Sequence, residues 1–251
     1  MGPEGEARFR WPSGKRAAVS WSFDDARLSQ VDRGLGVLDG CGAKATFYVS
    51  VANVEQRLGP WRAAVAAGHE IGNHTLNHPC SGNFLFARDK ALEGYTLDRM
   101  EAELLEANEA VEDLLGVVPE TFAYPCGQTY VGRGEGVRSY VPLVAGHFVV
   151  GRAAFSETHN DPAFCDLAQA FSRDADGRAF DELGAMVDQA LADGGWLILM
   201  GHEIGPEAGA RQVTNQQALV RLCEYCLDES RGIWLDTVAA VGKHIQEARS
   251  C

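Results

Sequence analysis

The stretch 17–25 constrains the fold of this chain more than any other, because the pattern of a buried strand ends there in two adjacent carboxylates. Residues 17–23, AAVSWSF, have the apolar, β-branched and aromatic content of such a strand. Consecutive side chains of a strand point to opposite faces, so Asp24 and Asp25 can serve one site only where the strand ends and the backbone turns. Ligands in α/β folds bind outside the carboxyl ends of strands, which places the pair for chemistry. The alternative is that one Asp only caps the following helix.

Strands and helices alternate along the rest of the chain. Further strands are expected at 45–49, 69–73, 121–124, 148–150, 196–200 and 233–235. Helices are expected at 28–40, 54–67, 97–115 with Thr96 as N-cap, 180–192, 213–226, and after the last strand. This alternation predicts a mainly parallel sheet, either open or closed into a barrel. Residues 79–95 and 152–178 lack clear periodicity, and long loops inside compact domains are usually functional or mobile.

Length and charge limit the possible partners. The 251 residues are 46% hydrophobic and contain nothing that resembles a linker, so one domain over residues 1–251 is expected. The net charge of -13 argues against nucleic acid and anionic membrane surfaces, and makes a neutral or cationic substrate easier to accept. No apolar run approaches the roughly 20 residues that span a membrane. The start lacks a basic region followed by an apolar core, which indicates a cytoplasmic protein or a secreted one without its signal peptide.

The cysteines indicate no disulfide framework. Seven of them are scattered through a chain that is large enough to need no such links, so reduced thiols are expected. Cys223 and Cys226 lie on an expected helix, and one Cys-x-x-Cys cannot supply four zinc ligands, so both are interpreted as core or helix-surface thiols. His69, inside an expected strand, is interpreted as a hydrogen-bonded core residue.

Four expected strands end in residues that can do chemistry. These are Asp24 with Asp25, His74 with His78, the sequence Pro125-Cys126-Gly127, and His202. In a β/α barrel such strand ends share one face, on which catalytic groups assemble. His74 and His78 are four residues apart, a spacing that puts two imidazoles on one side of a helical turn and lets both reach one ion. Two histidines and a carboxylate leave coordination positions open for water and substrate.

The ordered motifs SFDD (22–25), GHEIGNHTLNHP (68–79), FAYPCG (122–127) and LMGH (199–202) resemble those of the NodB-type polysaccharide deacetylases, the chitin-deacetylase-like carbohydrate esterase family. The resemblance extends over residues 17–235 and implies a distorted (β/α) barrel of about seven parallel strands. It also implies a divalent metal held by Asp25, His74 and His78. Zinc is expected, with Co²⁺, Ni²⁺ or Mn²⁺ as alternatives. Bound zinc lowers the pKa of its water from about 16 to near 7.

The same resemblance implies roles for three further residues. Asp24 resembles the catalytic base, and His202 resembles the general acid that protonates the leaving amine or alcohol. The backbone N–H of Cys126 resembles the oxyanion donor next to the metal, a group typically worth about 10²–10³ in rate. Because only this N–H is needed, the thiol of Cys126 is interpreted as incidental.

Two motifs depart from the family pattern. The third motif usually contains an Arg that orients the base, and Ala123 occupies that position here. The fourth motif usually supplies an Asp after the following strand, where this chain has Gly151-Arg152-Ala153. We hypothesise that Arg152 approaches from the neighbouring strand end and replaces the missing guanidinium beside Asp24. The alternative is a surface arginine with a solvated head.

The sequence therefore predicts a metal-dependent hydrolase that removes acetyl groups from an N-acetylated or O-acetylated carbohydrate. One alternative is a hydrolase of small cyclic amides or ureides on the same scaffold. Others are a weakly active carbohydrate-binding relative and a non-haem iron oxygenase, although an oxygenase has no use for Asp24 and His202. A long open groove would favour an oligosaccharide, whereas a pocket capped by Phe84, Phe86 and the 153–178 loop would favour a small molecule.

Overall fold

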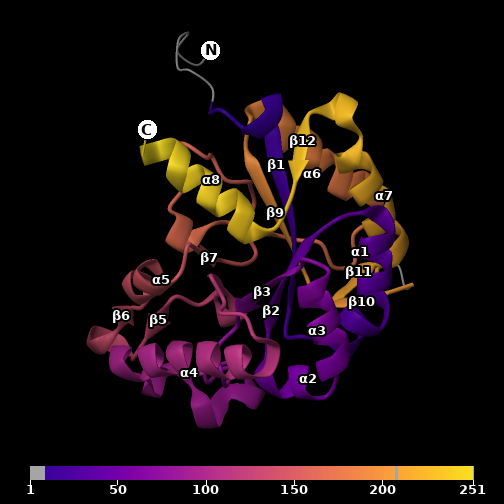
Figure 1. The fold of residues 1–251 in the computed structure, drawn as a ribbon. Helices are drawn as coiled ribbons and strands as arrows, with labels where there is room; N and C mark the ends of the chain where they lie inside the picture. Colours follow the sequence, from indigo (N-terminus) through magenta and orange to yellow (C-terminus); the bar gives the residue numbers. More distant parts are fainter. Residues whose placement is uncertain (1–8, 207–208, 251) are drawn as a thin grey trace.

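A parallel sheet forms the centre of the computed structural model, which describes residues 9–206 and 209–250 (Figure 1). Its strand order is β7-β4-β3-β2-β1-β9-β8, with β12 paired to the first half of β1. The bounds are β1 (Ala17–Asp24), β2 (Ala45–Val49), β3 (Glu70–Asn73), β4 (Thr121–Ala123), β7 (Val150–Arg152), β8 (Arg173–Asp174), β9 (Trp196–Gly201) and β12 (Ile233–Leu235). This arrangement confirms the expected distorted β/α barrel. The first eight residues, on which the signal-peptide prediction rests, and Cys251 lie outside the described residues.

The segment 170–174 joins the two ends of this sheet. Ala170 forms a parallel bridge with Arg152 of β7, and the Ala170 N–H donates to the Gly151 carbonyl over 2.8 Å. Three residues later the same segment, as β8, begins to pair in parallel with β9. The chain therefore passes from the β7 edge to the β9 edge and closes the sheet. The prediction of a structureless loop over 152–178 was wrong, because this closing strand is too short to produce a periodic pattern.

Strand β1 is buried along its whole length and sends alternate side chains to its two faces. Val19, Trp21 and Phe23 belong to the large apolar cluster that also includes residues of the covering helices. Ser22 and Asp24 therefore point to the opposite face, where the Ser22 hydroxyl donates to the Leu199 carbonyl over 2.8 Å. Asp24 is thus the last residue of the strand to face the inside of the barrel.

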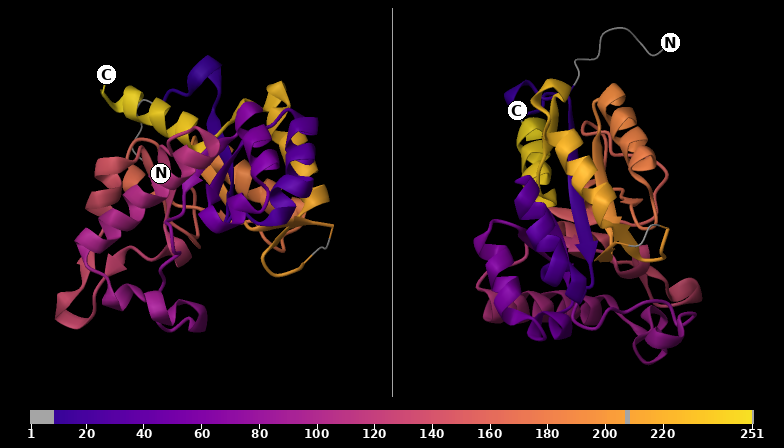
Figure 2. Two further views of the ribbon diagram at one scale, coloured as in Figure 1. Left: turned by 60° about the horizontal axis from the view of Figure 1, so that its bottom comes forward. Right: turned by 90° about the vertical axis from the view of Figure 1, so that its right-hand side faces the viewer.

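Helices cover the outside of the strands (Figure 2). They are α1 (Leu35–Cys41), α2 (Val51–Glu55), α3 (Leu58–Ala66), α4 (Leu97–Leu115), α5 (Val141–His147), α6 (Phe180–Asp193), α7 (Gln216–Leu227) and α8 (Val238–Ser250). The start of α4 is as expected, since the Thr96 side chain accepts from the Arg99 N–H. None of the described helices is long and apolar enough to cross a membrane.

Several element boundaries differ from those expected. The helix expected at 54–67 is divided into α2 and α3, and the one expected at 28–40 begins with a π-turn at Gln30–Gly34. Residues 213–215 form strand β11, which pairs with β10 (Glu203–Gly205), so α7 begins later than expected. Residues 141–147 form α5 ahead of β7. Two short strands, β5 (Tyr130–Val131) and β6 (Arg138–Ser139), make a small antiparallel pair.

The structure also describes the side chains to which the sequence assigned no chemistry. Cys223 and Cys226 are buried on α7, and the six described cysteines are free. His69 is buried, accepts a hydrogen bond from the Ala45 N–H over 3.1 Å, and lies 3.2 Å from Asp39. Cys223, Cys226 and His69 therefore support the core, and none of them lines the pocket at the strand ends.

Replacing Phe47 by alanine should destabilise the whole fold. Its ring is fully buried and lies 5.7 Å from Phe23 and 5.4 Å from Trp61, so its removal leaves a cavity between the sheet and α3. We expect the free energy of unfolding to fall by about 3–5 kcal/mol in denaturant titrations. Phe164→Ala, at a side chain that is 78% exposed, serves as the control and should change it by less than about 0.5 kcal/mol. Equal losses in both variants would contradict the assigned core.

Candidate active site

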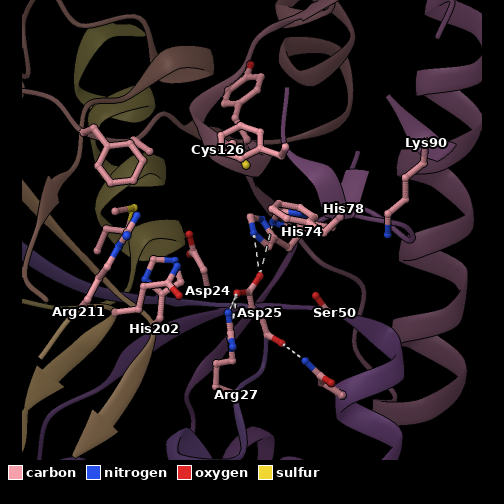
Figure 3. Close-up of a pocket in the computed structure, with 18 residues that line it drawn as sticks. Asp24, Asp25, Arg27, Ser50, His74, His78, Lys90, Cys126, His202 and Arg211 are labelled. Atoms are coloured by element: carbon pink, nitrogen blue, oxygen red, sulfur yellow. Dashed lines mark hydrogen bonds and ion pairs between the residues drawn. The ribbon is translucent and has the colours of Figure 1, made fainter. Parts of the chain in front are cut away.

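A pocket of about 640 Å³ lies at the carboxyl ends of the strands (Figure 3). Six of the seven residues that the sequence singled out line it: Asp24, Asp25, His74, His78, Cys126 and His202. The seventh, Arg152, is fully buried behind the pocket. The barrel thus brings together residues from β1, β3, β4, β7 and β9 that are far apart in the sequence.

Asp25 and the two histidines form a compact group of possible metal ligands. Asp25 Oδ1 lies 3.6 Å from His74 Nε2 and 3.5 Å from His78 Nε2, and one ligand atom from each residue lies within 4.8 Å of the others. The other oxygen, Oδ2, accepts from Arg27 at 2.9 and 3.0 Å. One carboxylate oxygen is therefore held by Arg27 while the other faces both imidazoles. This set of nitrogen and oxygen donors suits a divalent transition metal.

The histidines converge by a route other than the expected helical turn. Residues 74–78 form a bend after β3, in which Thr75 (φ 64°) and His78 (φ 51°) have left-handed backbone conformations. Side chains hold the bend, because Asn73 Oδ1 accepts from the Thr75 N–H and Thr75 Oγ1 accepts from the His78 N–H. The prediction that both imidazoles reach one point was right, but its helical explanation was wrong.

The protonation of both imidazoles fits metal binding. His74 Nδ1 lies 2.9 Å from the Ala123 carbonyl, which can only accept, so Nδ1 carries the proton and Nε2 keeps a free lone pair toward Asp25. Burial lowers the pKa of His78 to about 4, so this imidazole is neutral near pH 7. Burial raises the pKa of Asp25, but its electrostatic interactions with His74, His78, Arg27 and His202 outweigh burial and hold it below its usual value. A metal ion needs neutral imidazoles and an ionised carboxylate.

Arg152 contacts Asp24, as hypothesised from the sequence. Its Nη2 donates to Asp24 Oδ1, and its Nη1 donates to Ser172 Oγ over 3.2 Å. The guanidinium also lies over the Tyr48 ring, with Cζ 5.0 Å from the centroid. The guanidinium is entirely buried, which rules out the alternative of a solvated surface arginine. Asp24 of this pair lines the pocket, and Arg152 does not.

Asp176 is a site residue that the sequence analysis missed. Its Oδ2 lies 2.7 Å from His202 Nδ1, and its Oδ1 accepts from Thr214 Oγ1 over 2.7 Å. Burial lowers the pKa of His202, but the hydrogen bond to Asp176 and the charge of Asp24 raise it above its usual value. The sequence analysis looked for the Asp of the fourth motif at 151–153, after the strand that follows the third motif. Asp176 lies instead between β8 and α6. Its only signal in the sequence was its position between a strand that was not recognised and an expected helix.

Cys126 lines the pocket at a 3-10 turn, Pro125–Gly127, where its φ is 54°. Within the described part of the chain its N–H donates to no protein acceptor, so this donor is available to a ligand. Its thiol lies beside the thiol of buried Cys80, whose Sγ is 3.5 Å from His78 Nδ1. One ligand atom from each of His78, Cys80 and Cys126 lies within 4.8 Å of the others.

One family model matches the first half of the chain, and curated relatives match part of the chain. The model, described as polysaccharide deacetylase, matches residues 12–135, which include Asp24, Asp25, His74 and His78. The peptidoglycan-N-acetylglucosamine deacetylase PgdA of Listeria monocytogenes is 31% identical over 110 residues, which are 43% of this chain and 21% of that protein. The match thus spans only about a fifth of the relative's length.

Solved structures match the fold over nearly the whole chain. An acetyl xylan esterase of family 4 from Clostridium thermocellum, in complex with a cobalt ion, has a TM-score of 0.57 and 19% identity, with 90% of each chain covered. The Puue allantoinase has a TM-score of 0.68 and 15% identity, with 97% of this chain and 95% of that chain covered. Residues 12–135 thus match the polysaccharide deacetylase family model, and nearly the whole chain shares the fold of these solved structures.

Proposed function

We propose that this protein is a metal-dependent hydrolase that removes acetyl groups from an N-acetylated or O-acetylated carbohydrate. The observation that best supports the proposal is the placement of Asp24 and His202 in the same pocket as the Asp25–His74–His78 group. The hydrolysis of an amide or ester needs a group that accepts a proton from water and another that donates one to the leaving atom. The pocket offers a candidate for each role.

Asp25, His74 and His78 would hold the metal, with zinc as the first choice and Co²⁺, Ni²⁺ or Mn²⁺ as alternatives. When bound, such an ion polarises an acyl carbonyl and acidifies water. Asp24 would accept the proton through Oδ2, because its Oδ1 already accepts from Arg152. Arg152 would act as a positioning residue, since its buried guanidinium fixes the direction of the carboxylate.

His202 and Cys126 would act on the other atoms of the scissile group. Asp176 accepts from His202 Nδ1, so Nε2 is the ring nitrogen left to donate a proton to the leaving amine or alcohol. The Cys126 N–H would donate to the acyl oxygen as negative charge develops there. These roles would divide proton transfer and charge stabilisation among Asp24, His202 and the Cys126 N–H, with Arg152 and Asp176 holding the first two in place.

A hydrolase of small cyclic amides is the second candidate. Phe84, Phe86 and Phe155 line the pocket, and the fold is shared with an allantoinase. A site of about 640 Å³ accommodates a compact ligand as readily as one or two sugar residues. The two candidates differ in the product, because opening a cyclic amide releases no acetate.

Acetate release from N-acetylglucosamine oligomers and acetylated xylan tests the proposed function directly. We expect the zinc-loaded or cobalt-loaded protein to release acetate, and a chelator to abolish the reaction. Asp24→Asn should lower kcat/KM by about 10²–10⁴ while metal content stays unchanged, because the change removes the proton acceptor and leaves the ligands in place. His78→Ala should lower both activity and bound metal, measured by elemental analysis after dialysis.

His147→Ala is the matched control for the metal measurement, since His147 is paired with Glu101 on α4, outside the pocket. It should leave metal content and activity unchanged. If no acetate forms from any of these substrates while metal is bound, the acetyl-hydrolase proposal fails. Ring opening of a cyclic ureide by the same preparation would then support the second candidate.

Arg152→Ala should damage catalysis and stability together. Removal of one partner from a buried ion pair costs about 3–5 kcal/mol of unfolding free energy, because the other charge is left without compensation. We expect kcat to fall by about 10–100-fold, with a smaller change in KM, since the substrate contacts remain. Arg62→Ala, at an exposed guanidinium that donates to a backbone carbonyl, is the control. Unchanged kcat in folded Arg152→Ala would refute the positioning role.

The alkaline limb of the pH profile should depend on Asp176. His202 must be protonated to act as an acid, so activity is present below its pKa and is lost as pH rises through that value. Asp176→Asn removes the charged partner that raises this pKa, and the loss should therefore move to lower pH. Asp188→Asn, whose carboxylate bonds Tyr225 on the outer surface, should leave the profile of kcat/KM unchanged. An alkaline limb that does not move in Asp176→Asn would contradict the assignment of His202.

A further inference from the structure

Two cations stand at the pocket without a carboxylate partner. Lys90 and Arg211 both line it, and within residues 9–206 and 209–250 neither forms an ion pair. Figure 3 shows Lys90 on the side of His78 and Arg211 on the side of His202, with the two aspartates between them. A ligand in the pocket would therefore lie between two positive charges that pair with no carboxylate among residues 9–206 and 209–250.

The negative charges of the two aspartates in the pocket are already balanced by arginines. Asp24 is paired with Arg152, and Asp25 with Arg27. A divalent metal on Asp25 and the histidines would add further positive charge. Among the described residues that line the pocket, Arg27, Lys90 and Arg211 outnumber Asp24 and Asp25, although the whole chain carries a net charge of -13. Low-dielectric walls around a cleft strengthen the field of the charges that line it, so the local charges outweigh the distant acids for a bound ligand.

Aromatic side chains share the pocket with these cations. Phe86 and Phe155 are 60% and 63% exposed and line the pocket, and the Phe86 ring lies 6.2 Å from the His78 ring. Phe155 has a φ of 57°, a conformation that bulky residues adopt rarely and that recurs at ligand clamps. Exposed aromatic rings offer flat surfaces against which the apolar face of a sugar ring can pack.

We propose that the substrate is an acidic sugar derivative, an acetylated sugar that carries a carboxylate on the part that remains after acetyl removal. His202 would protonate the leaving atom, so the sugar would lie on its side of the pocket, where Arg211 also lies. Arg211 would bind the carboxylate, with Lys90 contributing from the opposite side. This inference rests on the proposed function, and it replaces the preference for a neutral or cationic substrate that the net charge of the chain suggested.

Binding to the metal-loaded Asp24→Asn protein tests the proposal without dependence on turnover. The probes are N-acetylglucosamine, its 3-O-carboxyethyl ether and its 6-carboxylate, each titrated by calorimetry at low and high salt. We expect at least one acidic sugar to bind about tenfold more tightly than the neutral sugar, a difference of about 1.4 kcal/mol. High salt should reduce that difference, because exposed charges are screened.

Variants at the cations assign the preference to named residues. Arg211→Gln in the same background should bring the ratio of acidic to neutral affinity close to one, and Lys90→Gln should reduce it partly. Arg88→Gln is the matched control, since Arg88 lies on the same 3-10 turn as Lys90 but outside the pocket lining. The proposal would be overturned if acidic and neutral sugars bind equally well, or if none of the three sugars binds. It would also be overturned if Arg211→Gln weakens the binding of acidic and neutral sugars equally. Absence of acetate release alone would contradict only the proposed function.

Discussion

The buried pair between Arg152 and Asp24 is the interaction on which the rest of the site depends. A guanidinium inside a barrel costs several kcal/mol unless it is paired and its donors are satisfied. Asp24 supplies the charge, and Ser172 and the Ala153 carbonyl accept from the second amino group. These partners meet only because the segment 170–174 runs between β7 and β9. Closure of the barrel and pairing of its buried arginine therefore depend on the same segment, and the carboxylate that faces the pocket is oriented as a consequence.

The sequence predicted the part of the site that lies at the ends of long apolar strands. Asp24, Asp25 and His202 follow β1 and β9, which are buried along their whole length and produce an unmistakable pattern. Asp176 follows β8, a strand of two residues held by its neighbours in space, and so short a strand has no pattern of its own. Arg152 was predicted because Ala123 occupies the position of the family's arginine, so that another guanidinium was needed beside Asp24. Its burial could not have been inferred, because composition favours exposed arginines.

The backbone conformation of the residues around the pocket was the other feature of the site that the sequence could not predict. Asp25, His78, Cys126, Phe155 and Gln212 all have positive φ and line the pocket. Non-glycine residues avoid this region, at a cost of about 1–3 kcal/mol for each, so no propensity argument predicts them there. The surroundings enforce the conformation: the Asp25 carbonyl accepts from Asn53 while its carboxylate accepts from Arg27. This left-handed turn is also what lets two consecutive aspartates serve one pocket.

Net charge and local charge act on different steps of recognition. The charge of -13 is the sum over the whole chain, and at physiological salt the influence of each exposed charge decays over about 8 Å. It therefore affects the approach of a ligand, and an acidic molecule approaches against it. Within the pocket Asp24 and Asp25 are neutralised by Arg152 and Arg27, so a bound ligand senses the cations that remain. A protein with a negative net charge and cations in its pocket would repel polyanions in general. It would still bind a small acidic ligand whose shape fits the pocket. Charge distribution, rather than total charge, then becomes the basis of selectivity.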